Sequence, residues 1–206
     1  MNPDIICIQE IANKDRVAAL LATESFFKSC AFQDSADGQD NAIFVDGPIG
    51  MNDILDPEGF QHPAQAAYVA YQGFDAIIMT VHLSWTNITL RQKEKELLKE
   101  VVSQMLKIDP DVIVAGDFNT QGPDIEDLAE SIGMIVMVPH DQEAVGTTHA
   151  GNRYDHFLIS PDLVSEEAIS CRIQTFTGSD LTTAERVSDR LPVIAYFKTD
   201  FKYRDR

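Results

Sequence analysis

The sequence predicts a mixed α/β protein in which strands outnumber helices and pack into sheets. Short apolar runs bounded by polar or glycine-rich segments recur along the chain. The clearest run, residues 112–116, is followed by an Asp-Phe-Asn sequence and indicates a strand buried on both faces. Residues 89–107 have the best helical pattern, because leucine, valine and methionine return at helical spacing. No repeat or low-complexity linker divides the 206 residues, so we expect one domain over residues 1–206.

In the N-terminal half, the predicted strands alternate with loops and one short helix. Gly73 separates two apolar runs and predicts a hairpin. Residues 46–66 are rich in glycine, proline and aspartate and predict a long loop between strands. We expect a helix over residues 13–22 and strands over residues 4–9, 41–45, 67–72 and 75–83.

In the C-terminal half, turn residues bound the predicted elements. Asp109 and Pro110 end the long helix, and Gly133 ends a shorter helix over residues 123–132. Residues 139–152 form a polar loop. We expect the remaining strands over residues 112–116, 134–138, 155–159, 169–176 and 191–197.

The balance of acidic and basic residues argues against a protein that binds duplex DNA. The net charge is −17, from 16 basic and 33 acidic residues, whereas nonspecific nucleic-acid binding depends on neutralising phosphates. Residues 46–66 and 139–150 contain no lysine or arginine. The long helix predicts an ordinary solvated face, because its basic residues alternate with acidic ones: Arg91, Lys93, Lys95 and Lys99 with Glu94, Glu96 and Glu100. We therefore expect a small phosphate ester or phosphodiester as substrate rather than duplex DNA.

The cysteines and the hydropathy pattern indicate a cytoplasmic location. No run of 18 or more apolar residues would span a membrane, and the N-terminus lacks the features of a secretory signal. Three widely separated cysteines, Cys7, Cys30 and Cys171, form neither a zinc spacing nor a disulfide framework.

Polar residues stand at the ends of several predicted strands. In a strand, residues two apart point the same way, so Asp117 and Asn119 would project together while Phe118 turns back into the core. A turn is the structural alternative, because Asp and Asn are common where strands end. Four further polar residues hold similar positions: Glu10, His82, Asp155 and Asp189.

Each of these four residues also has a structural explanation. Glu10 would suit a helix N-terminus, and His82 could be a hydrogen-bonded core histidine. Asp155 could pair with Arg153, and Asp189 could belong to a turn. Acids that converge on one edge of a core repel each other, however, unless a cation lies among them. Mg²⁺ or Mn²⁺ suits such oxygen ligands, whereas zinc would need His and Cys sets that the chain does not supply.

Six motifs follow one another along nearly the whole chain. They are Pro3-Asp4-Ile5-Ile6-Cys7-Ile8-Gln9-Glu10, Asn41-Ala42-Ile43, Thr80-Val81-His82-Leu83, Gly116-Asp117-Phe118-Asn119, Arg153-Tyr154-Asp155-His156-Phe157-Leu158 and Ser188-Asp189-Arg190-Leu191-Pro192-Val193. In this order they resemble the endonuclease/exonuclease/phosphatase superfamily, which includes apurinic-site endonucleases, neutral sphingomyelinases and inositol polyphosphate 5-phosphatases. The resemblance implies a four-layer sandwich of two packed, mainly antiparallel sheets flanked by helices, with the site at one edge.

The resemblance also implies roles for individual residues. Glu10 is similar to the glutamate that binds metal, and Asp189 to the first acid of the Ser-Asp-His ending. Asp117 resembles the aspartate that activates the attacking water, and Asn119 the amide that orients it. His82 and Asp155 match residues that lie at the scissile phosphate. The predicted activity is that of a metal-dependent phosphodiesterase or nuclease-like hydrolase, with Mg²⁺ or Mn²⁺ as cofactor.

One departure from the motifs concerns the chemistry. Arg190 stands where the Ser-Asp-His ending has its histidine. An arginine stays protonated and can clamp a phosphate, but it can neither ligate a metal nor exchange a proton near neutral pH. We therefore predict activity that is weak or absent on the usual substrates of the family. The competing hypothesis is a catalytically inactive member that binds a partner or a phosphorylated ligand. An unrelated sandwich with coincidental strand-end acids is a third alternative, which the order of the motifs opposes.

A second departure concerns the first strand. Relatives open with a strand that ends in a metal-binding asparagine, and this sequence begins just ahead of Gln9 and Glu10. A start codon assigned too late, a chain trimmed for crystallisation and a natural short form are three explanations. In the last case a second copy of the chain would cover the open sheet edge as a homodimer.

The single tryptophan lies close to these motifs. Trp85 follows Leu83 by two residues and is therefore expected near His82. It could stack on a nucleobase or pack beneath the site, and we favour packing.

Overall fold

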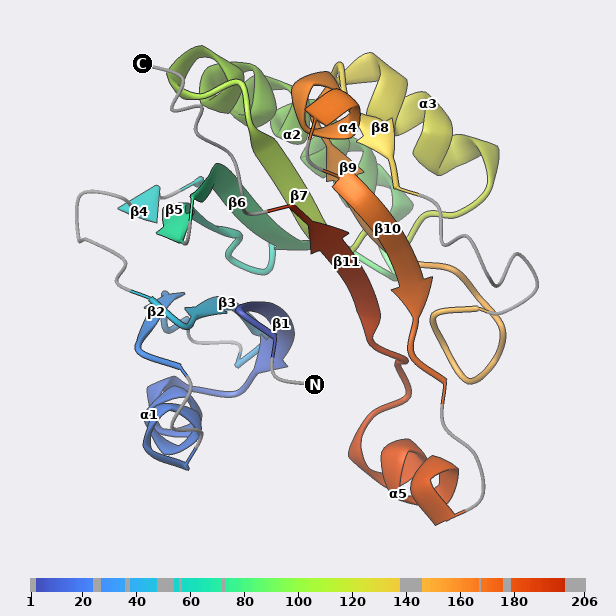
Figure 1. Cartoon of the computed structure of the whole chain (residues 1–206). Helices are drawn as coiled ribbons and strands as arrows, with labels where there is room; N and C mark the ends of the chain where they lie inside the picture. The colour runs from blue at the N-terminus through green and yellow to red at the C-terminus, as the bar shows by residue number, and fades with distance from the viewer. Residues whose placement is uncertain are drawn as a thin grey trace.

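The described part of the chain contains strands and helices, which Figure 1 shows in chain order by colour. The computed structural model describes residues 3–23, 27–35, 38–47, 54–55, 57–71, 73–137, 146–166, 168–175 and 179–198. In chain order the elements are β1 (Ile5–Ile11), α1 (Lys14–Thr23), β2 (Ser29–Phe32), β3 (Asp40–Val45), β4 (Ile54–Leu55), β5 (Gln65–Tyr71), β6 (Phe74–His82), α2 (Ile88–Ile108), β7 (Val112–Asp117), α3 (Pro123–Ser131), β8 (Ile135–Val136), β9 (Asp155–Ile159), α4 (Pro161–Glu166), β10 (Ala168–Ile173), α5 (Ser179–Val187) and β11 (Val193–Phe197). Each predicted strand and helix is present, β9 with the predicted ends and the others with shifted ends, and β2, β4, α4 and α5 are additional.

Two sheets contain most of the strands. One has six strands in the order β4-β5-β6-β7-β9-β8, and the other has three in the order β1-β3-β2. The described strand pairs are antiparallel except β6–β7, a parallel pair that α2 connects. The predicted mainly antiparallel architecture is confirmed.

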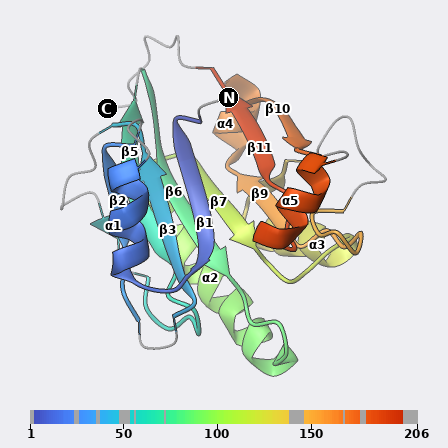
Figure 2. The ribbon, with the colours of Figure 1, turned by 90° about the horizontal axis from the view of Figure 1, so that it is seen from below.

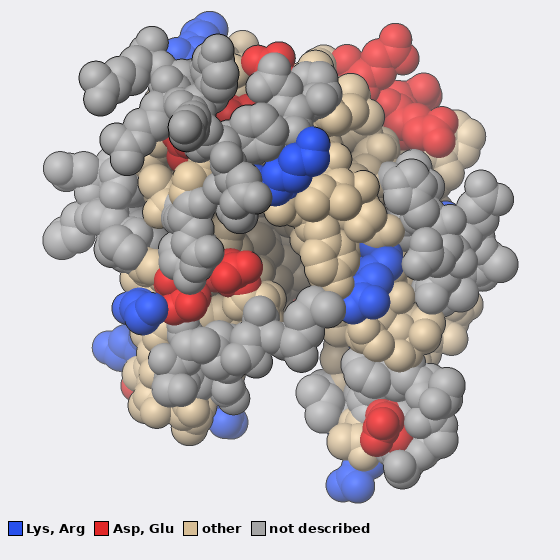
Figure 3. Space-filling model, in the orientation of Figure 1, with Lys and Arg blue, Asp and Glu red and all other residues tan. Residues whose placement is uncertain are grey.

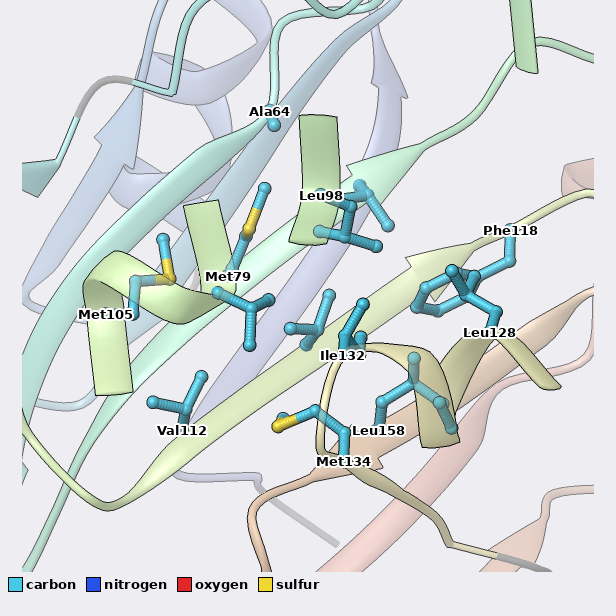
Figure 4. Close-up of a cluster of buried hydrophobic side chains, with 14 of the residues drawn as sticks. Ala64, Met79, Leu98, Met105, Val112, Phe118, Leu128, Ile132, Met134 and Leu158 are labelled. Atoms are coloured by element: carbon cyan, nitrogen blue, oxygen red, sulfur yellow. The ribbon is translucent and has the colours of Figure 1, made fainter. Parts of the chain in front are cut away.

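The two sheets face each other, and helices cover their outer sides (Figure 2). Alternate residues of β3 point to opposite faces. Ala42 and Phe44 pack with Val17 of α1, which lies outside the three-stranded sheet. Ile43 and Val45 instead pack between the sheets. Figure 4 shows the third core, between the six-stranded sheet and helices α2 and α3, where the buried side chains include Leu98, Met105, Phe118, Leu128 and Leu158. The chain therefore forms the predicted four layers.

The last two strands form a small sheet of their own. β10 and β11 pair antiparallel, and neither pairs with a described strand of the larger sheets. Ala168 and Phe197 from this pair pack against the core between the larger sheets, as Ile5 of β1 does. This pair is a two-stranded ribbon beside the two packed sheets, and it contacts the core between them through these side chains.

Helix α2 has a buried carboxylate on the side that faces the six-stranded sheet. Glu94 is 1% exposed, and its two oxygens accept the backbone N–H groups of Gln61 at 2.9 Å and Ser84 at 2.8 Å. Lys95 is buried as well. The prediction that the charged residues of this helix form a solvated face is therefore wrong for both. Among the described residues, neither α2 nor any other helix is long and apolar enough to cross a membrane.

Replacing Glu94 with alanine is expected to lower the free energy of unfolding by about 2–3 kcal/mol, because two buried N–H groups lose a charged acceptor. Urea unfolding followed by circular dichroism measures the change. Glu96→Ala is the matched control, since the Glu96 side chain is 69% exposed and pairs only with Lys99 among the described residues. The control should change stability by less than about 0.5 kcal/mol. Equal effects of the two substitutions would contradict the anchoring role of Glu94.

Candidate active site

Three neighbouring strands of the six-stranded sheet bring three predicted site residues together. The strand register pairs His82 of β6 with Asp117 of β7, and Asp117 with Asp155 of β9. Because β9 is antiparallel to β7, its first residue reaches the edge at which β6 and β7 end. His82 is 6% exposed and Asp117 is 3% exposed, so the imidazole and the carboxylate are held inside the protein.

A glycine allows the close approach of β6 and β7 beside the site. Gly116 has a φ of +137°, and a Cβ atom at this position would lie 2.1 Å from the carbonyl oxygen of Val81. A side chain would therefore push the two strands apart next to the Asp117–His82 pair. The Gly-Asp sequence at this strand end is required by the backbone as well as by the chemistry.

The backbone turns sharply after Asp117. Asn119 has a φ of 47°, a left-handed conformation that asparagine tolerates better than most residues. Its N–H donates to Asp117 Oδ1 at 2.8 Å, and its side-chain amide donates to the Leu83 carbonyl at 2.7 Å. Because β7 ends at Asp117, Asn119 does not continue the strand as expected, although its N–H still contacts the Asp117 carboxylate. Phe118 is fully buried, as predicted.

The amide oxygen of Asn119 is an available acceptor. This Oδ1 atom is buried and accepts no hydrogen bond from the part of the chain that the structure describes. A buried polar atom of this kind costs free energy unless a ligand or water reaches it. The geometry therefore suits an amide that accepts a hydrogen bond from a bound water.

The imidazole of His82 lies between two carboxylates. Its Nε2 atom is 3.7 Å from Asp117 Oδ2 and 3.8 Å from Glu10 Oε1. Glu10 has a φ of 61° at a bulge in β1. Such positions store strain and concentrate at functional sites. His62 stacks on His82 with ring centroids 4.7 Å apart, a contact that the sequence pattern gives no means to foresee.

Arg190 supplies the cation that the acidic cluster requires. Its guanidinium hydrogen-bonds to Asp117 Oδ2 and, at 3.2 Å, to Asp155 Oδ2, and it lies 3.7 Å from Asp189 Oδ1. It also lies over the ring of Tyr154, 5.7 Å from the centroid. Three of the four acids that the sequence places at strand ends, Asp117, Asp155 and Asp189, are therefore joined by an arginine of the same chain.

The same burial changes the protonation of the cluster. Burial, and to a smaller extent the nearby Asp155, raise the pKa of Asp117 to about 7, although Arg190 and the Asn119 N–H act to lower it. Burial also raises the pKa of Asp155, against hydrogen bonds from Thr147 and Arg190. Thr147 Oγ1 in turn accepts the N–H of Asp155 at 3.1 Å, so this threonine orients Asp155. A carboxyl group that titrates near neutral pH suits proton transfer.

A cavity of about 590 Å³ lies beside this cluster, and the residues that line it include Glu10, His82, Asn119, Asp189 and Arg190. Trp85 lines the cavity and is 56% exposed, so it does not pack beneath the site. Its ring makes an edge contact with Tyr154 at a centroid distance of 5.3 Å. Asp189 lies at the rim with a side chain that is 85% exposed. Asp53 and Asp56 of the predicted loop over residues 46–66 lie outside the described residues, as do residue 138 and residues 139–145 of the predicted polar loop.

The donor chemistry fits a divalent cation with few protein ligands. Mg²⁺ takes one or two carboxylates and keeps several waters. Glu10 and Asp189 line the cavity, and their side chains are 60% and 85% exposed, so both can reach a hydrated ion. Within the described residues, no group of three or more His, Cys, Asp and Glu residues forms a closed metal site. Glu10 and Asp189 as metal ligands stay a prediction.

Comparisons with known proteins agree with this architecture. The sequence model of the endonuclease/exonuclease/phosphatase family matches residues 1–189. The 3′-5′ exonuclease NExo from Neisseria meningitidis is similar in structure, with a TM-score of 0.72 and 20% identity over 95% of this chain and 89% of that chain. TDP2 from D. rerio, complexed with single-strand DNA product, has a TM-score of 0.69 and 18% identity over 95% and 86%. An AP endonuclease from Archaeoglobus fulgidus has a TM-score of 0.67 and 20% identity over 95% and 89%. No curated protein matches the chain.

Proposed function

The chain belongs to the endonuclease/exonuclease/phosphatase family, and on this premise we propose that it hydrolyses phosphodiester or phosphate-ester bonds by attack of water at phosphorus. The observation that supports the proposal best is the environment of Asp117. Its pKa of about 7 suits a general base near neutral pH. His82 and Asn119 lie beside it and can bind or orient the other participants in the reaction.

The proposed reaction uses four side chains. Asn119 Oδ1 accepts a hydrogen bond from the attacking water, and Asp117 takes its proton as the new O–P bond forms. His82 and Arg190 donate hydrogen bonds to phosphate oxygens, which stabilises the charge that develops on them. The bond from phosphorus to the leaving oxygen breaks, and that oxygen takes a proton from solvent. Mg²⁺ or Mn²⁺ held by Glu10 and Asp189 would neutralise phosphate charge.

We also propose that turnover is slow, because Arg190 engages the proposed base. The guanidinium bonds to Asp117 Oδ2, which leaves this carboxylate less able to approach a water. Arg190 can exchange Asp117 for a phosphate oxygen, but it stays protonated throughout. It therefore replaces the charge of the family's histidine without replacing proton transfer.

The same contact favours a second candidate function, in which the chain binds a phosphorylated ligand or a partner without turnover. In that case the Arg190–Asp117 pair is permanent, and the cavity serves recognition alone. Binding of a phosphate ester without release of product would separate this candidate from the hydrolase.

The surface charge supports a small substrate rather than duplex DNA. Figure 3 shows Lys and Arg as isolated patches on the face drawn, while acidic side chains gather over α3. Helix α3 contributes the acidic residues Asp124, Glu126, Asp127 and Glu130. A long polyanion would be repelled by this surface, whereas a small phosphate ester needs only the cavity around Arg190.

The assembly and the location are two further proposals. Among the described strands, β1 pairs only with β3, so one edge of β1 offers backbone donors and acceptors that a second copy could pair with. A strict monomer in light scattering would argue against this homodimer. The cytoplasmic location stays a prediction, supported by three cysteines that form no disulfide.

Removal of divalent metal is expected to lower hydrolysis at least about tenfold, because phosphate charge is then left less neutralised. The assay panel is a bis-aryl phosphodiester, plasmid DNA, an abasic duplex and an inositol phosphate, each with EDTA and after readdition of Mg²⁺ or Mn²⁺. Unchanged rates in EDTA would contradict the metal requirement.

Arg190→His tests the proposal of slow turnover in the same panel. The substitution should raise the rate, because the imidazole can exchange a proton and releases Asp117. Cleavage by the unaltered protein at rates typical of active relatives would refute slow turnover.

A further inference from the structure

The cavity rim displays an aromatic ring on a fixed backbone. Trp85 lies in the loop between β6 and α2 and exposes 56% of its surface. A single exposed apolar residue is common on protein surfaces, so exposure alone means little. Its position beside Tyr154 and Arg190 on the cavity wall is what distinguishes this tryptophan.

Helix α2 holds the backbone of this loop. Arg91 donates from one guanidinium nitrogen to the carbonyl oxygens of Ser84 at 3.0 Å and Trp85 at 2.9 Å. Buried Glu94 accepts the N–H of Ser84 from the other side. The loop therefore presents the indole from a preorganised backbone, which reduces the conformational entropy lost when a ligand binds to it.

The ring geometry leaves room for a third ring. Trp85 and Tyr154 meet edge to face, with 65° between their planes, so the two faces are not stacked on each other. Tyr154 lies next to Arg190 through a cation–π contact of 5.7 Å. A ligand ring stacked on the Trp85 indole would therefore be separated from the Arg190 guanidinium, which is proposed to hold phosphate, by the indole and the Tyr154 ring.

The charge of the molecule adds a reason for such a contact. With a net charge of −17, the protein attracts no phosphate ester through its overall field. Stacking is independent of charge, and a base stacked on an aromatic side chain contributes about 1–3 kcal/mol by alanine substitution.

We propose that Trp85, supported by Tyr154, binds a planar aromatic ring in the alcohol portion of the substrate while Arg190 holds its phosphate group. This inference rests on the proposed function, because it assigns a substrate class to that site. The ring is either a nucleobase or the ring of an aryl ester, and both present the same flat face to the indole.

The test uses equilibrium binding and needs no turnover. Trp85 is the only tryptophan in the chain, so its fluorescence reports this residue alone. Thymidine 5′-monophosphate, phenyl phosphate and ribose 5-phosphate serve as probes, since they carry a base, an aryl ring and no aromatic ring. We expect the first or the second to quench the emission and to bind at least fivefold more tightly than ribose 5-phosphate. The tighter of the two identifies the kind of ring.

Variants measured by calorimetry complete the test. Trp85→Ala should weaken the ring-bearing probe at least fivefold and leave ribose 5-phosphate within twofold, while Trp85→Phe should keep most of the affinity. Ile169→Ala is the control, because Ile169 is 55% exposed on β10, away from the cavity lining. Equal affinity for all three probes, or equal loss for all three in Trp85→Ala, would overturn the inference. Ring-dependent binding without hydrolysis would refute the hydrolase and leave this inference standing.

Discussion

Replacing Asp117 with asparagine is expected to lower kcat/KM for the best substrate by about 10³-fold, within the range that general-base catalysis contributes. Asparagine has nearly the same shape and keeps an oxygen for the Asn119 N–H, which now donates to Asp117 Oδ1 at 2.8 Å. It cannot take a proton from water. Steady-state hydrolysis of a chromogenic phosphodiester measures the loss.

The pH profile separates this role from a structural one. With a pKa of about 7, Asp117 is protonated at low pH and becomes a base as the pH rises. The kcat/KM of the unaltered protein should therefore increase up to about pH 7 and then level off, and the residual rate of Asp117→Asn should lack this step. Asp15→Asn, on the exposed surface of α1, is the control and should keep both rate and profile. Retention of activity within a few fold by Asp117→Asn would exclude the proposed base.

Replacing Arg190 with leucine is expected to lower the free energy of unfolding by about 3 kcal/mol at pH 8, because two buried carboxylates lose their cation. The Asp117 and Asp155 side chains are 4% and 14% exposed, so solvent cannot replace the guanidinium fully. Urea unfolding at fixed pH gives the difference. Arg16→Leu, on exposed α1, should change stability by less than about 0.5 kcal/mol.

The loss in Arg190→Leu should depend on pH in a defined direction. Folded Asp117 keeps its proton up to about pH 7, whereas an aspartate of the unfolded chain loses it near pH 4. Between these values the folded state binds more protons, so stability falls as the pH rises. Without Arg190 the pKa of Asp117 rises further and the window extends above pH 7. The difference between variant and parent should thus be larger at pH 8 than at pH 5, and a constant difference would argue against the buried ion pair.

The positions of the strands could be predicted because local rules determine them. The apolar run before Asp117 has the length and composition of a buried strand, and glycine and proline mark the boundaries of its neighbours. The resemblance to the family motifs predicted that His82, Asp117 and Asp155 lie in one site, and the observed strand register agrees. The partners of individual side chains were predicted less well. Asn119, for example, has a left-handed backbone conformation that ends the strand geometry, and the local sequence pattern does not specify this conformation.

The errors arose where tertiary contacts override a local pattern. Alternating charge along α2 predicts solvation, yet Glu94 is buried because the loops that contain Gln61 and Ser84 bring N–H groups to it. Trp85 is a large apolar residue and was expected to pack beneath the site. Arg91 instead holds the backbone of its loop, and the indole ring is exposed. The contact of Arg190 with Asp117 joins residues 73 positions apart, which spacing alone cannot reveal.

The register of β6, β7 and β9 has a consequence for how such a site can evolve. Backbone hydrogen bonds set the separation of neighbouring strands at about 4.8 Å, whatever side chains they bear. The spacing of His82, Asp117 and Asp155 is therefore determined by the backbone of the sheet, and substitutions elsewhere in the core leave it unchanged. Trp85, Tyr154 and Arg190 belong to connecting segments outside the strands, where sequence varies more freely. Substrate preference can thus diversify in the loops while the reactive groups keep their distances.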